Sequence, residues 1–237
     1  METIKKVVDY CREIMGISIS DKQIEQLSTY EKLLVVTNEV MNLTSIVDHD
    51  GVWYKHFLDS ITILDQLPEQ NTKLIDVGTG GGFPGMVIAI IRPDINVTLL
   101  DATKKKVEFL KMVAEKLCLN NVRFIHGRSE EVAHNPQYRE SFDYATTRAV
   151  SSFNTCLEIC IGLIKKDGHL LLMRGPSGHD EYGKSTGKLT LFSLILDNYK
   201  LYENPYSLMN SYVFSFSKTK VTNKNYPRSY ARIVSDK

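Results

Sequence analysis

The fold class follows from one short segment, Leu74-Ile75-Asp76-Val77-Gly78-Thr79-Gly80-Gly81-Gly82-Phe83-Pro84-Gly85. Its start is apolar apart from Asp76, as in a buried strand. The glycines that follow tolerate backbone conformations closed to other residues and let the chain approach a ligand closely. Pro84 suits the first turn of a helix. The segment therefore predicts a strand, a glycine-rich loop and a helix in direct succession.

Short apolar runs alternate with helical stretches from this segment onward. The runs that predict strands are Lys73–Val77, Val97–Leu100, Val122–His126, Phe142–Thr146 and His169–Met173. The helices between them are expected to begin near Pro84, Thr103, Ser129 and Ser152. This alternation predicts an α/β fold of Rossmann-like type, with a mostly parallel sheet, right-handed crossovers and helices on both faces.

The two ends of the chain differ from this pattern. Before it, the stretches Ile4–Met15 and Val52–Leu67 and a helix capped by Ser20 predict a helical cap without a strand. After it, Tyr212–Ser217 is typical of a late, antiparallel strand, and the glycine-rich segment Gly175–Gly187 predicts a mobile loop. We therefore expect a cap over residues 1–70 and a Rossmann-like core with a basic C-terminal tail over residues 71–237, in one compact body.

Length and composition exclude several classes of protein. A chain of 237 residues, 43% of them hydrophobic, can bury a sizeable core, but its apolar runs fall far short of the roughly 20 residues of a membrane span. Residues 1–16 carry charges throughout, unlike a secretory signal. The four cysteines lack metal-binding spacing and are expected to be reduced core thiols. We expect a cytoplasmic monomer with no membrane segment and no metal.

Basic residues gather in two places, although the net charge is only +1. Residues 171–237 hold 10 Lys and Arg against 5 Asp and Glu, whereas residues 1–70 hold 6 against 12. The second basic segment runs from Lys104 to Arg128. Either can contact a polyanion such as RNA, and a solvated helix face is the plain alternative. The candidate RNA-binding residues are Lys104, Lys105, Lys106, Arg123, Arg174 and Arg228.

The glycine segment fits neither common phosphate-binding motif. Counted from Gly78, the sixth position of a dinucleotide fingerprint is Phe83, and this segment does not contain the Gly-Lys-Ser/Thr of a P-loop. Asp76 would repel a pyrophosphate but attract a ligand that carries an ammonium and a sulfonium. Asp101, after the second strand, can accept hydrogen bonds from a ribose diol. Together they predict S-adenosylmethionine; in the alternative, Asp76 caps a turn and Asp101 caps the next helix.

Two further strand ends complete the predicted site. After the third strand, Gly127-Arg128-Ser129-Glu130 is expected to flank the adenine, with the Ser129 amide near the ring edge. The fourth strand ends in Thr146-Thr147-Arg148-Ala149-Val150, which lacks the Asp/Asn-Pro-Pro-aromatic signature of exocyclic-amine methylation. No cysteine follows a proline, so the usual setting for thiolate addition is missing as well.

An acceptor that is already nucleophilic fits this strand end better. Guanine N7 has a free lone pair and no proton, so it needs placement more than a general base. Arg148 is expected to supply placement, because its planar fork could hold guanine O6 or a flanking phosphate.

Several motifs together resemble a known family. They are Asn42-Leu43-Thr44-Ser45-Ile46, His56-Phe57-Leu58-Asp59-Ser60, the glycine segment, Leu100-Asp101, Arg128-Ser129-Glu130 and Thr147-Arg148-Ala149. In this order they resemble the bacterial 16S ribosomal RNA guanine-N7 methyltransferases, also called glucose-inhibited division protein B, over nearly the whole chain. One departure is Arg174-Gly175, where members of the family often have Lys-Gly.

The resemblance implies a class I S-adenosylmethionine-dependent methyltransferase that acts on a guanine in the decoding-region loop of small-subunit ribosomal RNA. It implies cofactor binding by Gly78, Phe83, Ser129, Glu130 and Arg148, to which the residues themselves add Asp76, Gly80 and Asp101. Two rival functions remain open. One is methylation of a small molecule; the other is a non-catalytic role in RNA binding or ribosome assembly.

Two smaller features of the sequence can each be interpreted in two ways. His56 and Asp59 lie one helical turn apart, so they either pair within the cap or face the active site. Tyr226-Pro227-Arg228-Ser229-Tyr230 interleaves aromatic and basic residues, which suits an unpaired base and its phosphate but also an ordinary tail.

Overall fold

The computed structural model describes residues 1–69, 71–207 and 210–236. The predicted boundary between cap and core at residue 70 lies outside the described residues, as does Lys237 at the end of the basic tail. The division at that boundary therefore stays a prediction.

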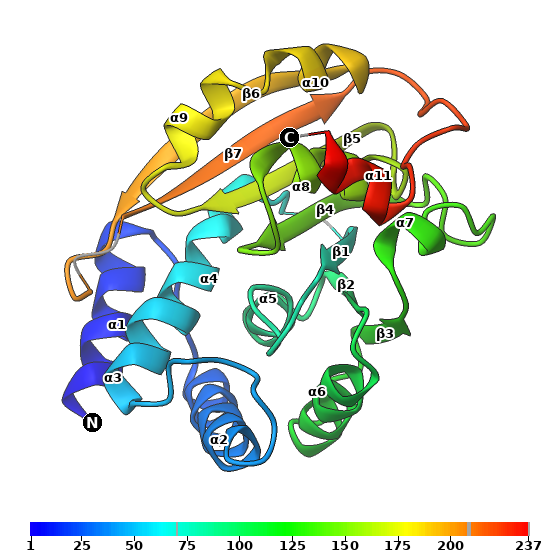
Figure 1. Ribbon diagram of the computed structural model, residues 1–237. Coiled ribbons are helices and arrows are strands. Elements are labelled where there is room, and N and C mark those ends of the chain that lie inside the picture. Colours follow the sequence, from blue (N-terminus) through cyan, green and yellow to red (C-terminus); the bar gives the residue numbers. More distant parts are fainter. Residues whose placement is uncertain (70, 208–209, 237) are drawn as a thin grey trace.

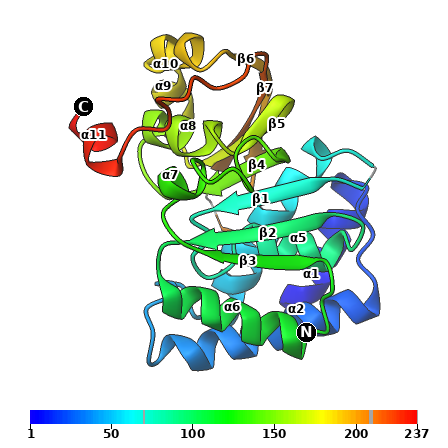
Figure 2. The ribbon, with the colours of Figure 1, turned by 90° about the vertical axis from the view of Figure 1, so that its right-hand side faces the viewer.

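A seven-stranded sheet forms the centre of the fold, in the order β3-β2-β1-β4-β5-β7-β6. Its strands are β1 (Lys73–Val77), β2 (Asn96–Asp101), β3 (Val122–His126), β4 (Phe142–Arg148), β5 (Ile164–Arg174), β6 (Leu194–Glu203) and β7 (Asn210–Lys218). The first five run parallel, and β1, β2 and β3 point the same way in Figure 2. Strand β7 runs antiparallel to both β5 and β6. The predicted Rossmann-like sheet with a late antiparallel strand is confirmed.

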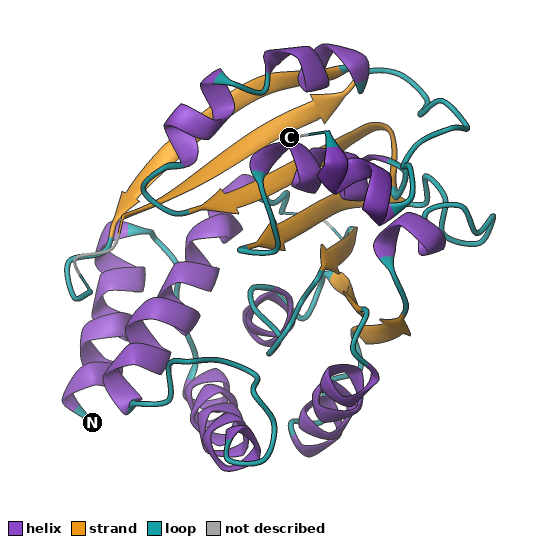
Figure 3. Cartoon of the chain, in the orientation of Figure 1, coloured by secondary structure: helices purple, strands orange, loops and turns teal. Residues whose placement is uncertain are grey.

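Helices cover both faces of this sheet (Figure 3). One face packs against the N-terminal helices, α5 and α6, and the other against α7 to α11. The elements are α1 (Glu2–Ile14), α2 (Asp21–Asn38), α3 (His49–Gly51), η1 (Val52–Leu58), α4 (Asp59–Ile61), η2 (Thr62–Gln66), α5 (Gly85–Ile91), α6 (Lys104–Lys116), α7 (Ser129–Val132), α8 (Phe153–Ile161), α9 (Gly178–Gly183), α10 (Thr186–Leu191) and α11 (Tyr230–Ser235).

The N-terminal helices pack onto the core beside α5 (Figure 1). Helix α2 begins after Ser20, as predicted, in a capping box where the Gln23 amide donates to the Ser20 hydroxyl and the Gln23 side chain accepts from the Ser20 amide. Residues Val52–Leu58 form a π-helix, η1, which continues into α4. Trp53 and Phe57 from η1 are fully buried in the same cluster as the α5 side chains, so cap and sheet share one core.

Two predictions of detail are wrong, and one strand was missed. The segment Gly175–Gly187 is not a loop throughout, because α9 lies within it and α10 begins in it. Strand β6 was not predicted, since it lies at the sheet edge and carries exposed polar residues such as Lys200 that interrupt an apolar run. Cys118 is exposed, whereas the other three cysteines are buried as expected.

Candidate functional site

The glycine loop closes around the buried carboxylate of Asp76. Asp76 Oδ2 accepts hydrogen bonds from the Thr79 hydroxyl at 2.6 Å and from the Gly85 amide at 2.9 Å. Asp76 Oδ1 is buried and has no partner among the residues that the structure describes. Burial raises the pKa of Asp76 to about 6. Because a buried oxygen without a donor is destabilising, this carboxylate is poised to accept a hydrogen bond from a ligand.

Asp101 fixes the same loop from the neighbouring strand. Gly78 and Gly80 have positive φ angles of +71° and +59°, and a Cβ on Gly78 would lie 2.5 Å from Val150 Cγ2. Asp101 Oδ2 accepts from the Gly80 amide at 2.9 Å, and Oδ1 accepts from the Thr103 amide at 2.8 Å. Asp76 therefore braces its turn, as in the alternative interpretation, whereas Asp101 contacts the amide of Thr103 and does not cap α6, which has no side-chain cap. A carboxylate offers about four acceptor positions, so contact with a ribose stays a prediction.

The predicted cofactor residues gather at the carboxyl edge of the sheet. Gly78 follows β1, Asp101 ends β2, and Arg148 ends β4. Ser129 and Glu130 begin α7 after β3, and both are buried. Since β3, β2, β1 and β4 are adjacent and parallel, these residues lie along one edge, where α/β sheets bind their ligands.

Arg148 is held by the cap. Its Nη1 donates to Asp59 Oδ2 at 2.8 Å and to the Lys55 carbonyl oxygen at 3.2 Å, and its Nη2 donates to His56 Nδ1 at 3.2 Å. The guanidinium also lies 5.2 Å from the centre of the Phe83 ring. Both terminal nitrogens are therefore engaged, so the fork could hold an acceptor base or phosphate only by giving up contacts with the cap.

His56 links Arg148 to the glycine loop. Its ring stacks on Phe83, with centroids 4.3 Å apart and planes 17° apart, and its Nε2 lies 2.8 Å from the Thr44 hydroxyl. Burial and the nearby charge of Arg148 lower the pKa of His56 to about 3. The ring is therefore neutral, with Nδ1 accepting from Arg148 and Nε2–H donating to Thr44. Among the described residues, His56 and Asp59 do not pair with each other; both contact Arg148, which favours the interpretation in which they face the site.

A cavity of about 480 Å³ opens beside Arg148, between the ends of β4 and β5, the cap and the β6–β7 hairpin. Its walls combine apolar and polar side chains, as in sites that hold flat organic ligands. The residues that line it are Ile46, Lys55, His56, Asp59, Arg148, Ala149, Val150, Ser151, Met173, Arg174, Gly175, Ser177, Glu181, Asn204, Ser207, Asn210 and Ser211. Arg174, a predicted RNA contact, belongs to this wall. Glu181 was not predicted, because it lies in a segment that was expected to be a loop.

A second cavity, of about 540 Å³, lies between α7 and the C-terminal segment. Arg128 and Tyr230 line it, with the Arg128 guanidinium 5.1 Å from the centre of the Tyr230 ring. Arg228 also borders this cavity but donates to Glu158 Oε1 and Oε2 at 2.7 Å each and to Asp236 Oδ2 at 2.5 Å. Its charge is thus balanced inside the protein, which weakens the case for a phosphate contact by this residue.

The remaining predicted RNA contacts come from two elements: three lysines begin α6, whereas Arg123 of β3 lies between Val122 and Phe124, which pack on the α6 side of the sheet, so its side chain points to the other face. Lys104 and Lys105 are exposed at the start of α6, Lys106 is half-buried beside them, and Arg123 is exposed on β3. The ion pair of Lys104 with Glu108 is weak, because Lys104 Nζ and Glu108 Oε1 are 3.7 Å apart and both side chains are exposed to solvent. This group is free to meet a polyanion, and that role stays a prediction.

The described residues contain neither a candidate metal site nor a candidate membrane span. No group of His, Cys, Asp and Glu in residues 1–69, 71–207 and 210–236 could hold a metal ion. Within the same ranges, no helix is both long enough and apolar enough to cross a membrane.

Comparison with known proteins points to one family. The family model described as rRNA small subunit methyltransferase G (GidB) matches residues 23–208. The ribosomal RNA small subunit methyltransferase G of Alkaliphilus metalliredigens is 39% identical over 229 residues, which cover 96% of this chain and 95% of that protein. Its namesake from Leuconostoc mesenteroides is 38% identical over 219 residues, covering 90% of each chain.

Solved structures that are distant in sequence share the fold. The TYW2 protein of M. jannaschii, solved in complex with AdoMet, superposes with a TM-score of 0.53 at 13% identity, covering 68% of this chain and 76% of that one. The YcgJ protein of Bacillus subtilis superposes with a TM-score of 0.53 at 15% identity, covering 70% of this chain and all of that one. At such identities the likeness concerns the fold alone, which is that of class I methyltransferases.

Proposed function

Since this chain belongs to the rRNA small subunit methyltransferase G family, we propose that it transfers the methyl group of S-adenosylmethionine to N7 of a guanine in 16S ribosomal RNA. The observation that carries the cofactor assignment is the buried Oδ1 of Asp76 beneath the glycine loop, which has no hydrogen-bond partner among the described residues. We further propose that the protein acts as a cytoplasmic monomer on the small ribosomal subunit.

The donors and acceptors at the sheet edge fit this cofactor. Asp76 Oδ1 would accept from the ammonium of its methionine part, and the remaining lone pairs of Asp101 would accept from the ribose hydroxyls. Gly78 and Gly80 lack side chains where the ligand must come close to the backbone. The Ser129 amide and Glu130 would flank the adenine. When bound, S-adenosylmethionine supplies an electrophilic methyl on a cationic sulfur.

The chain's own contribution to catalysis is placement. Guanine N7 attacks with its lone pair and has no proton to lose, so none of the carboxylates or His56 needs to act as a base. A free cation beside the reacting centre would oppose the positive charge that forms on the methylated purine. Arg148 avoids this cost because the Asp59 carboxylate neutralises it. Arg148 therefore acts as a positioning residue that holds His56 against Phe83 of the glycine loop.

The RNA would approach over the lysines at the start of α6 and past the sheet edge at β3. Lys104, Lys105, Lys106 and Arg123 would neutralise phosphates and orient the strand, with the acceptor base entering the cavity beside Arg148. Arg174 and Arg228 were predicted to join this set. The burial of Arg174 in the cavity wall and the internal ion pairs of Arg228 favour other roles for these two.

The decisive test is mass spectrometry of nucleosides from ribosomal RNA of cells with and without the gene. We expect 7-methylguanosine to disappear from 16S RNA in the mutant, and purified protein with S-adenosylmethionine to restore it on mutant small subunits. A small-molecule methyltransferase would leave the RNA unchanged. A non-catalytic assembly protein would bind the particle but transfer no methyl group.

A further inference from the structure

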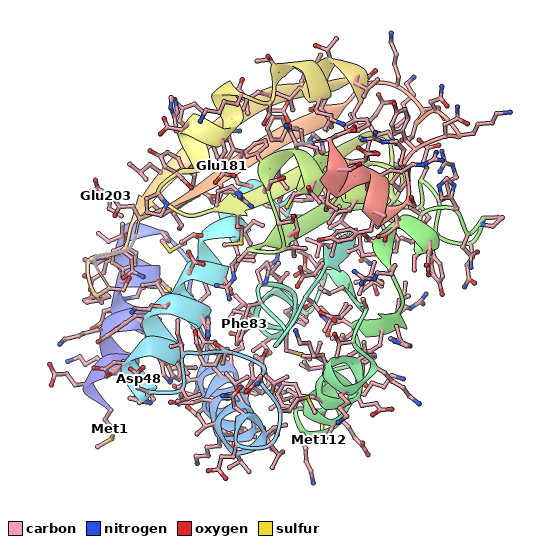
Figure 4. All side chains as sticks on the ribbon, in the orientation of Figure 1. Met1, Asp48, Phe83, Met112, Glu181 and Glu203 are labelled. Carbon is pink, nitrogen blue, oxygen red and sulfur yellow. The ribbon has the colours of Figure 1, made fainter. Side chains whose placement is uncertain are left out.

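The cavity beside Arg148 has a polar end formed by Arg174 and Glu181. Arg174 ends β5, one residue beyond Met173, which is paired with Arg148 of β4. Glu181 comes from α9, where Figure 4 labels it. From the carboxyl edge of the sheet across the cavity, the order of these charged residues is therefore Arg148, Arg174 and Glu181.

Arg174 has a donor to spare. Its Nη1 donates to the Ser151 carbonyl oxygen at 2.7 Å, and its Nη2 donates to the Glu181 carboxylate. The side chain is only 11% exposed, and its Nε is buried with no acceptor in the part of the chain that the structure describes. A buried N–H without an acceptor destabilises the protein unless a ligand supplies one. A small shift of Arg174 toward the cavity would bring this N–H to a ligand oxygen.

Glu181 has acceptor positions to spare. Its Oε1 accepts from the Ser177 hydroxyl at 2.7 Å, and its Oε2 accepts from Arg174. A carboxylate has about four acceptor positions, so about two remain for a ligand. The side chain is 30% exposed and lines the cavity. The polar end of the cavity thus combines one donor with a two-acceptor carboxylate.

We infer that Arg174 and Glu181 read the acceptor base as guanine. Guanine presents the acceptor O6 next to two donors, N1–H and N2–H, which match the Arg174 guanidinium and the Glu181 carboxylate. With these contacts made, N7 lies on the O6 side of the ring and faces Arg148 and the cofactor edge. Adenine presents an amino group at position 6 and a lone pair at N1, so both contacts would become repulsive.

A phosphate contact for Arg174 is the less favourable assignment. The Glu181 carboxylate lies against the Arg174 guanidinium and would repel a phosphate at the same place. The base assignment uses both charges and the unpaired Nε–H. It rests on the proposed function and adds to it the two residues that select the base.

The test combines protein variants with base analogues. Small subunits are reconstituted with RNA that carries guanosine, inosine or 2-aminopurine riboside at the nucleotide that the wild-type protein methylates. Inosine lacks the N2 amine, and 2-aminopurine lacks O6 and N1–H, while both keep N7. Methyl transfer is measured as kcat/KM for the wild type, Glu181→Gln, Arg174→Gln and the control Asp65→Asn, which breaks an exposed ion pair with Lys200 outside the cavity.

We expect the wild type and Asp65→Asn to lose about 10- to 100-fold in kcat/KM on each analogue, as for a lost charge-assisted hydrogen bond. Glu181→Gln should be slow on guanosine and lose little more on inosine. Arg174→Gln should also be slow on guanosine and should lose less on 2-aminopurine than the wild type does, although this base also lacks the N1–H that donates to Glu181. Affinity for S-adenosylmethionine should not change. Equal wild-type rates on all three bases would overturn the inference, as would proportional losses of the variants on every base. If the wild type methylates no guanosine at all, the proposed function itself fails.

Discussion

Arg148 Nη1 and Asp59 Oδ2 are 2.8 Å apart, although 89 residues separate them in the sequence. This ion pair joins the end of β4 to the cap at the edge of the cavity beside Arg148, and both side chains are largely buried. A buried pair with further hydrogen bonds to Lys55 and His56 fixes one orientation of the guanidinium. The cap therefore completes the site.

Replacing Arg148 with Lys should separate placement from cofactor binding. Lysine keeps the charge but cannot contact Asp59, Lys55 and His56 together, so His56 and Phe83 lose their support. We expect single-turnover methyl transfer to fall by about 10- to 100-fold, as for a small misplacement of reacting groups. Affinity for S-adenosylmethionine, measured by calorimetry, should change by less than transfer does. Wild-type transfer in a folded variant would exclude the positioning role.

The free energy of unfolding should depend on pH in a way that shows that His56 is neutral in the folded protein. Its pKa is lowered to about 3 in the folded protein, from an ordinary 6.5. The unfolded chain therefore binds a proton below about pH 6.5 that the folded chain does not, and stability falls as pH drops from 6.5 toward 3, by up to about 1.4 kcal/mol per pH unit.

His56→Asn isolates this contribution, because Asn can still accept from Arg148 but takes up no proton. Urea unfolding of the wild type and the variant between pH 5 and 7.5 should differ in slope by about one proton. The comparison cancels the opposite contribution of Asp76, whose pKa is raised to about 6 and which therefore favours the folded state at lower pH. Parallel pH profiles of the two proteins would show that His56 is not buried as a neutral ring.

Cofactor affinity should depend on the ionisation of Asp76. Its carboxyl is protonated below about pH 6 in the free protein, and the ammonium of S-adenosylmethionine prefers the ionised form. Affinity measured by calorimetry should thus fall by about tenfold per pH unit below that value. Asp76→Asn should bind more weakly with little pH dependence. A wild-type affinity that is constant from pH 5 to 7.5 would contradict this assignment.

Asp101→Asn tests the ribose contact. The amide has one oxygen and can accept from only one of the Gly80 and Thr103 amides, and it loses negative charge toward the diol. We therefore expect cofactor binding to weaken by about 1.5–3 kcal/mol. Asp94→Asn, which breaks an exposed ion pair with Arg92, is the matched control and should bind normally. Equal affinity of both variants, with circular dichroism unchanged, would mean that the ribose lies elsewhere.

Salt dependence should distinguish the basic surface of α6 from Arg228. If Lys105 meets a phosphate, Lys105→Glu should flatten the dependence of RNA affinity on salt, by about one unit of slope for each lost contact. Lys22→Glu on α2 is the control for an exposed lysine of the acidic cap. Arg228→Glu should lower the melting temperature, because it leaves the buried Glu158 without its main partner, and should leave the salt slope unchanged. If only Arg228→Glu reduced the salt dependence of RNA affinity, the C-terminal tail and not α6 would form the RNA interface.

The sequence by itself determined the sheet and the cofactor loop. The strands from Lys73–Val77 to His169–Met173 and the capped helix after Ser20 were predicted because apolar periodicity and caps are local signals. Asp76 was predicted at the start of the glycine loop because the motif that contains it is one continuous stretch of sequence. These features need no knowledge of which distant segments meet.

Only the tertiary structure decided which residues surround the cavity beside Arg148. The pair of Arg148 with Asp59 joins segments far apart in the sequence, and the wall of Arg174 and Glu181 depends on α9, which sequence patterns did not predict. It also showed that Arg228 is bound internally by Glu158 and Asp236. Whether a charged side chain contacts solvent, another residue or a ligand depends on how distant segments pack and on the local dielectric that results. Neither can be inferred from the residues next to it in the sequence.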